Sequence, residues 1–229
     1  MAAPPRAFYR ALDVGDLDTC LALLRRDDEP GSDGVAQNCR LAEILFHRGR
    51  RDDALECGRR ALAFAAADDT ETAPFCAWLF SNCACHDEAA LVYERLLDLN
   101  PGWVEGHRHA SGSLAASGEI DRAIPHAVAA SDLAPGEGEF ALHTGCLLLD
   151  AGRPGDAICY LRRALAADPD DNAALRGLSA ALFAMNRRDE ALDLALRAAA
   201  LQPDDPATAI HACELLMRCE RVDAAAATV

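Results

Sequence analysis

The stretch from Asn172 to Asp205 reads NAALRGLSAALFAMNRRDEALDLALRAAALQPDD, and it shows the organisation of this chain more clearly than any other. A proline stands near its end, and prolines recur at the same interval of 34 residues through most of the sequence. These prolines are Pro101, Pro135, Pro169 and Pro203. A fixed period of about 20–50 residues is the mark of a repeat protein, in which each repeat is one supersecondary unit. The sequence therefore predicts an array of similar units.

Small residues recur at positions 8, 20 and 27 of most periods, and the first unit departs from the pattern with Phe8 and Asp27. The clearest series is position 20, which holds Cys20, Ala54, Ala89, Ala123, Ala157, Ala191 and Ala225. A small side chain lets two antiparallel helices cross closely, whereas a large one would force their backbones apart. Larger apolar residues fill position 11, which holds Ala11, Leu45, Phe80, Leu114, Leu148, Leu182 and Leu216. The pattern indicates that each unit is a pair of packed helices.

The turn between the two helices is predicted at position 15. That position holds Gly15, Gly49, Ala84, Gly118, Gly152, Asn186 and Glu220. Glycine and asparagine are the residues that end a helix in the left-handed conformation. The proline at position 32 then closes the second helix, because the residue before a proline avoids the helical region.

With its 34-residue period, small positions and closing proline, the sequence resembles the tetratricopeptide-repeat family over essentially its whole length. The resemblance implies an all-α fold, a right-handed superhelical solenoid of stacked antiparallel helix pairs. We expect a single solenoid over 1–229, in which one additional residue near Asp69 shifts the frame. The repeats run over 1–34, 35–68, 70–103, 104–137, 138–171, 172–205 and, in part, 206–229.

Composition limits the classes of partner. The formal net charge of −15 argues against nucleic acid and anionic membranes, since both require a basic surface. No stretch approaches the roughly 20 apolar residues of a membrane span, and the N-terminus lacks the features of a signal peptide. We therefore expect a cytoplasmic protein with reduced cysteines. All 22 basic residues are arginine, and this bias together with the alanine content is typical of a GC-rich bacterial genome.

The resemblance also implies a binding surface. In the family, positions 2, 5, 9, 12 and 13 line a concave groove that holds a protein or peptide. The groove residues predicted here are Phe46, His47, Trp78, Asn82, Arg108, Leu142, Cys146, Leu149, Arg176, Phe183, Ile210 and Met217. An apolar stripe broken by arginines suits an amphipathic helix or an extended apolar segment. The alternatives are a surface for self-association, which would make a homo-oligomer, and side chains that only pack between helices.

Cys83, Cys85 and His86 form the one local cluster with metal-ligand composition. Structural zinc sites need a second pair of ligands elsewhere, so this run is a weak candidate for a metal or redox site, and structural thiols are the preferred interpretation. Histidines recur at position 6 as His109, His143 and His211, which favours packing or ligand contact over catalysis. We find no catalytic triad and no phosphate-binding loop, so the sequence predicts no catalytic residue and no cofactor.

The sequence therefore predicts a protein-interaction module, part of a longer bacterial protein. The alternative is the acceptor-recruitment arm of an enzyme, such as a protein glycosyltransferase with its catalytic domain beyond Val229. A metal or redox sensor that uses Cys83 and Cys85 is a third hypothesis. Binding of chaperone C-terminal tails is disfavoured, because related proteins that do so carry lysines in the groove and this chain has none.

Overall fold

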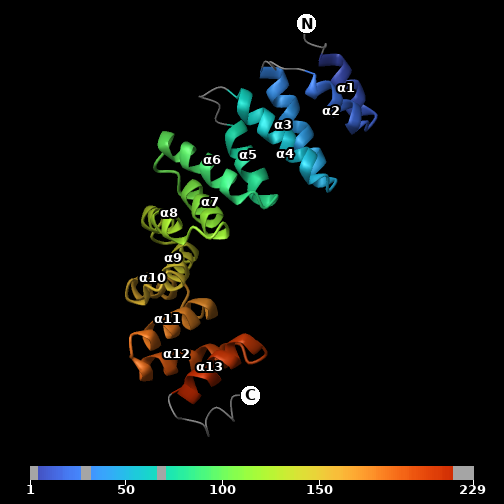
Figure 1. Ribbon diagram of the computed structural model, residues 1–229. Coiled ribbons are helices and arrows are strands. Elements are labelled where there is room, and N and C mark those ends of the chain that lie inside the picture. The colour runs from blue at the N-terminus through green and yellow to red at the C-terminus, as the bar shows by residue number, and fades with distance from the viewer. Residues whose placement is uncertain (1–4, 27–31, 66–70, 219–229) are drawn as a thin grey trace. The chain divides into compact units, whose positions relative to one another are not determined.

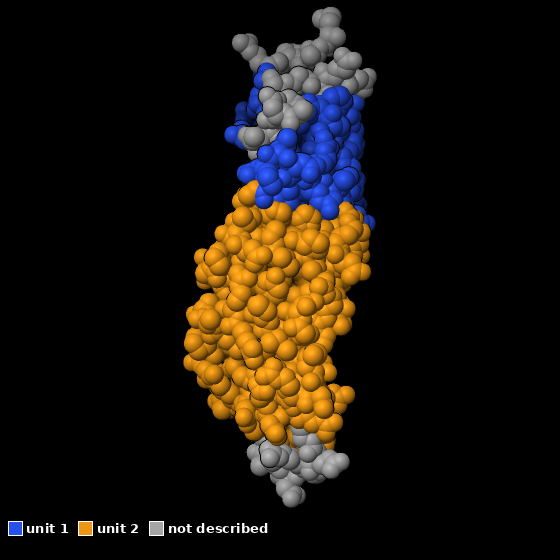
Figure 2. All heavy atoms as spheres, turned by 90° about the vertical axis from the view of Figure 1, so that its left-hand side faces the viewer, with its two compact units in different colours: residues 1–101 blue, residues 102–229 orange. Residues whose placement is uncertain are grey.

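The computed structural model describes residues 5–26, 32–65 and 71–218, and over these residues it contains helices and turns but no strand (Figure 1). Residues 1–101 and 102–229 form two compact units (Figure 2). The helices of the first unit are α1 (Pro5–Asp13), α2 (Leu17–Arg25), α3 (Ser32–His47), α4 (Arg51–Phe64), α5 (Thr72–Asn82) and α6 (His86–Leu99). Those of the second are α7 (Val104–Ala116), α8 (Ile120–Leu133), α9 (Gly138–Asp150), α10 (Pro154–Ala167), α11 (Asn172–Ala184), α12 (Arg188–Leu201) and α13 (Pro206–Arg218).

The described helices can be compared with the predicted repeat bounds, and α3 begins at Ser32, three residues before the second predicted repeat. The pairs α1–α2 to α11–α12 correspond to the first six repeats, and α13 is the first helix of the seventh. The predicted remainder of the seventh repeat, including Glu220 and Ala225, lies outside the described residues. None of the described helices is long and apolar enough to cross a membrane.

Each helix pair is joined by the predicted left-handed turn. Position 15 has a positive φ in six repeats, from +61° at Asn186 to +87° at Gly118. The next residue donates its backbone N–H to the carbonyl of position 11, as Arg153 does to Leu148 over 2.7 Å. This six-to-one hydrogen bond is the Schellman motif that ends a helix on a left-handed residue. Ala84 adopts the same conformation at φ +63°, although a Cβ makes this region costly for alanine.

The core lies where the two helices of a pair cross. The side chains at position 20 are fully buried in every described repeat, from Cys20 to Ala191. Leu148 and Leu182, at position 11, are each 1% exposed and fill the space beside them. Small residues are required at these crossings, because apolar surface is buried only if the helices approach closely.

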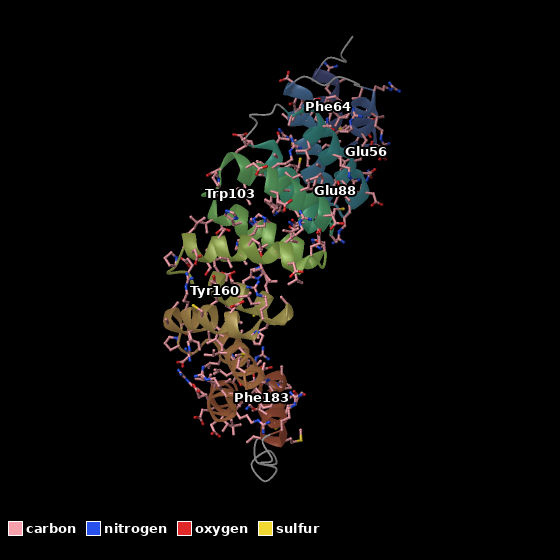
Figure 3. All side chains as sticks on the ribbon, turned by 60° about the vertical axis from the view of Figure 1, so that its left-hand side comes forward. Glu56, Phe64, Glu88, Trp103, Tyr160 and Phe183 are labelled. Atoms are coloured by element: carbon pink, nitrogen blue, oxygen red, sulfur yellow. The ribbon has the colours of Figure 1, made fainter. Side chains whose placement is uncertain are left out.

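Neighbouring repeats make contact mainly where the second helix of one packs against the first helix of the next, as α4 does against α5 and α10 against α11, and their first helices also touch one another. Helix α3 packs against α5 in the first unit, and α11 packs against both α9 and α13 in the second. On the outer surface, exposed ion pairs link second helices instead, as between Arg25 and Glu56 (2.5 Å) and between Arg59 and Glu88 (2.6 Å) (Figure 3). Such exposed pairs contribute little to stability. We call the surface that the first helices of a unit form together its inner surface.

Candidate functional site

The predicted groove residues all lie on first helices, and none of them is buried. In the first unit they are Phe46 and His47 on α3 and Trp78 and Asn82 on α5. In the second unit they are Arg108 on α7, Leu142, Cys146 and Leu149 on α9, Arg176 and Phe183 on α11, and Ile210 and Met217 on α13. Because the positions at the helix crossings are fully buried, the partial exposure of this set separates it from the core.

An aromatic cluster marks the inner surface of the first unit. The rings of Phe46 and Trp78 meet edge to face, with centroids 5.3 Å apart, and Phe75 lies 6.1 Å from Trp78. The side-chain amide of Asn82 donates to the Trp78 carbonyl over 2.8 Å. The Trp78 side chain remains 37% exposed, so the cluster can contact a partner as well as pack between α3 and α5.

A cavity of about 560 Å³ opens between α11 and α13 in the second unit. Phe183, one of the predicted groove residues and labelled in Figure 3, forms an apolar wall. The Arg218 guanidinium lies over its ring, 5.3 Å from the ring centroid. The residues that line the cavity are Ala180, Phe183, Ala184, His211, Glu214, Leu215 and Arg218. The cavity is thus apolar on one side and carries charged groups of both signs on the other.

A second cavity of about 530 Å³ lies on α13 and the turn before it. Ile210 and Met217, both predicted groove residues, line it and are 58% and 54% exposed. Glu214 lines both cavities, so the two cavities adjoin at this residue. The structure thus brings three of the predicted apolar side chains together at the end of the second unit.

His211 is held in one tautomer by its neighbours. Ser179 Oγ donates its hydrogen to the carbonyl of Ala191 over 2.7 Å, so the contact of 3.3 Å between this oxygen and His211 requires an Nε2–H donor. Nδ1 is then left as a hydrogen-bond acceptor. Burial lowers the pKa of His211, and the nearby charge of Arg176 lowers it further. The ring is therefore neutral at pH 7.

The remaining predicted residues of α9 take part in helix packing. Leu142 packs against a buried cluster formed by Ala141, Ala164 and Ala174. Burial raises the pKa of the Cys146 thiol, which keeps it protonated at neutral pH. This part of the inner surface therefore contributes packing between α9, α10 and α11 in addition to partial exposure.

The Cys83–His86 run spans the turn between α5 and α6. Cys85 Sγ accepts weakly from Arg59 Nη2 at 3.9 Å and lies 4.0 Å from the Cys83 carbonyl oxygen. Burial raises the pKa of Cys83. Within the described part of the chain, no three metal-binding side chains of the His, Cys, Asp or Glu type come together.

Comparisons with known proteins agree with this geometry. A family model for the tetratricopeptide repeat matches residues 148–208. Residues 148–208 are therefore tetratricopeptide repeats, and the described helices have the fold of a tetratricopeptide-repeat solenoid. Among solved structures, it is similar to YrrB, reported as a TPR protein with an unusual peptide-binding site, with a TM-score of 0.67 at 18% identity over 91% of this chain and 98% of that one. A comparison with curated proteins by sequence gives no match.

Two further solved structures show the same fold. MamA matches with a TM-score of 0.66 at 15% identity, over 74% of this chain and 92% of its own. A thermophilic TPR protein in Thermus thermophilus matches with a TM-score of 0.50 at 23% identity, over 80% of this chain and 99% of its own. At these identities the likeness concerns the fold of the repeats.

Some residues of the site stand at groove positions of the repeat, so the sequence could have selected them, and others do not. Glu214 and Arg218 stand at positions 9 and 13 of the seventh repeat, so the periodicity places them in the groove. Phe75 and Leu215 occupy positions 6 and 10, outside the groove set, and no pattern in the sequence selects them. Their role becomes visible only through the ring contact with Trp78 and the lining of the cavity.

Proposed function

We propose that this protein, whose fold is that of a protein–protein interaction module, holds a polypeptide segment against the inner surface formed by α11 and α13. The observation that carries the proposal is the pair of adjoining cavities lined by Phe183, Ile210 and Met217. Ile210 and Met217 are more than half exposed, at 58% and 54%, and both stand at predicted groove positions. Exposed apolar side chains in concave sites are the usual energetic anchors of an interface.

The polar groups of the site would orient the segment. The neutral His211 ring and the Glu214 carboxylate are acceptors, and a backbone N–H of the ligand is their natural partner. Apolar ligand side chains would occupy the two cavities, one against Phe183 and the other between Ile210 and Met217. The peptide-binding site reported for the similar YrrB structure supports this use of the fold.

The aromatic cluster of the first unit is a second surface for the same purpose. Trp78 is exposed enough to contact a ligand, and Phe46 and Phe75 hold its ring in place from two helices. A rigid, partly exposed aromatic side chain loses little conformational entropy on binding. We therefore include Phe46, His47, Trp78 and Asn82 in the proposed partner-binding surface.

Other uses of the chain stay predictions from the sequence. The sequence leaves two alternatives, in which the chain serves instead as the recruitment arm of a glycosyltransferase or as a surface for self-association. It also predicts a cytoplasmic, bacterial protein. The repeats account for every helix that the structure describes, and an interaction surface explains the exposure of the predicted residues.

Selection from a library of random twelve-residue peptides displayed on phage tests the proposal. Phe183→Ala removes the wall of the first cavity, and Leu196→Ala is the matched control, since Leu196 is 38% exposed on α12 and lines neither cavity. We expect the unmodified protein and the control to enrich the same apolar peptides and Phe183→Ala to lose them. Equal enrichment by all three proteins would refute the proposed site.

A further inference from the structure

Two arginines of the second unit stand in the same local setting, 68 residues apart. Arg108 and Arg176 both occupy position 5 of a repeat, and a serine follows each after three residues. A histidine of the next repeat contacts each serine: His143 Nε2 lies 3.0 Å from Ser111 Oγ, and His211 Nε2 lies 3.3 Å from Ser179 Oγ. The chain therefore contains the same arrangement twice and allows an internal comparison.

The two copies differ in the carboxylate that accompanies the arginine. Glu105, three residues before Arg108 on α7, accepts a hydrogen bond from the Arg108 Nε over 2.7 Å. The equivalent residue on α11 is Ala173, which is exposed and has no carboxylate to offer. Among the residues that the structure describes, Arg176 forms no ion pair or hydrogen bond, and its Nε is buried without a partner.

The carboxylate of Asp205, whose pKa responds to the charge of Arg176, is already engaged in other hydrogen bonds. The charge of Arg176 contributes to the lowered pKa of Asp205. The Asp205 oxygens, however, accept hydrogen bonds from Thr208 Oγ1 and from the backbone N–H groups of Ala207 and Thr208. This carboxylate caps the start of α13, and Thr208 is the main cause of its lowered pKa. Within the described residues, the Arg176 guanidinium therefore has no paired carboxylate, although the protein has a formal net charge of −15.

The position of Arg176 connects it to the proposed binding surface. Arg176, Ala180 and Phe183 are spaced four and three residues apart on α11, so they share one face of the helix. Ala180 and Phe183 line the cavity between α11 and α13. A ligand seated in this cavity therefore passes within about one helical turn of Arg176, and a guanidinium in such a place favours a carboxylate because it can donate two parallel hydrogen bonds.

We infer that the polypeptide segment bound at α11 and α13 carries an aspartate or glutamate whose side-chain carboxylate pairs with Arg176, as Glu105 pairs with Arg108. The inference rests on the proposed function and specifies the partner. The occupant is a segment of another protein in which an acidic side chain stands near an apolar one. The apolar side chain enters the cavity beside Phe183, and the acidic one supplies the carboxylate that α11 lacks.

The library selection tests this inference with three further variants. Arg176→Gln removes the cation, and Ala173→Glu supplies an internal carboxylate at the position that Glu105 holds in α7. Ala173 is exposed in the first turn of α11, where an acidic residue also favours the helix, so the variant is expected to fold. Arg197→Gln is the matched control, since Arg197 pairs with Asp170 and lines neither cavity.

The unmodified protein and Arg197→Gln are expected to enrich peptides in which Asp or Glu accompanies an apolar residue. Arg176→Gln and Ala173→Glu should select apolar peptides in which acidic residues occur no more often than in the starting library. For one selected peptide, exchange of its acidic residue for the amide should weaken binding about tenfold to the unmodified protein and less than twofold to Arg176→Gln.

The outcomes separate the two proposals. Apolar enrichment without an excess of acidic residues, or an acidic preference that survives in Arg176→Gln, would overturn the pairing with Arg176 and leave the binding site standing. An acidic preference that is kept in Ala173→Glu would contradict the comparison with Glu105. Enrichment that does not depend on Phe183 would refute the binding site and the inference together.

Discussion

Gly145 lies where α9 crosses α10, and replacing it with alanine tests the packing of the repeats. An added Cβ would lie 2.6 Å from Leu161 Cγ and 2.7 Å from Leu161 Cδ2, well inside van der Waals contact. The Leu161 side chain is fully buried, so it cannot move into solvent. Overpacking of a core typically costs about 1–3 kcal/mol. Alanine also recovers about 0.8–1.0 kcal/mol of helix propensity over glycine.

Gly112 provides the matched control on α7, where a Cβ would meet nothing within 4 Å. Gly112→Ala should therefore gain the propensity term alone and raise the free energy of unfolding by about 0.8–1.0 kcal/mol. Because both variants gain the same propensity, the difference between them isolates the clash with Leu161. We expect Gly145→Ala to be less stable than Gly112→Ala by about 1–3 kcal/mol.

Urea denaturation followed by far-ultraviolet circular dichroism measures this difference, provided that both variants unfold with the same dependence on urea. The refuting result is equal stability of the two variants. It would mean that Leu161 can yield without loss and that close approach of α9 and α10 is not what requires a small residue at position 8.

Three other measurements examine the core and the buried titratable groups. Ala191→Leu, at a fully buried helix crossing, should lower the free energy of unfolding in urea by about 1–3 kcal/mol, and an unchanged value would count against the repeat frame. Burial raises the pKa of the Cys57 thiol to about 12, whereas Cys159 is exposed. At pH 8 a thiol reagent should therefore label Cys159 in the native protein and leave Cys57 unmodified. Rapid labelling of both cysteines would contradict the burial of Cys57. Burial lowers the pKa values of His143 and His211 below 6.5, so the unfolded chain takes up their protons first, and the stability they contribute is present above pH 6.5 and lost as the pH falls below it. Unfolding free energy should decline from pH 7 to pH 5, with a smaller decline in His143→Gln, and identical declines would refute the assignment.

The features that the sequence predicted correctly are local and periodic. A glycine or asparagine stands at position 15 in five of the six repeats whose turn is described, and a small residue stands at position 20 in all six, so the copies support one interpretation. The left-handed turns at Gly118 and Asn186 and the full burial of Ala191 confirm it. Even Ala84, which lacks the freedom of glycine, follows the frame.

The features that escaped prediction depend on contacts between repeats. The hydrogen bond that fixes the tautomer of His211 joins residues 32 positions apart, and no local pattern indicates it. The different states of Arg108 and Arg176 depend on Glu105 and Ala173, whose significance emerges only when the two arginines are seen in equivalent surroundings. Which groove positions lie beside an open cavity also depends on the side chains of both α11 and α13.

The affinity of a selected peptide for the Phe183→Ala variant tests most directly whether the peptide binds between α11 and α13. It can be measured by fluorescence anisotropy with the unmodified protein and Leu196→Ala beside it. Truncation of a true anchor costs about 2 kcal/mol or more, so we predict that the dissociation constant rises about thirtyfold for Phe183→Ala and changes less than twofold for Leu196→Ala. If the folded Phe183→Ala variant binds the peptide as tightly as the unmodified protein does, the peptide sits elsewhere and the site assigned to α11 and α13 is wrong.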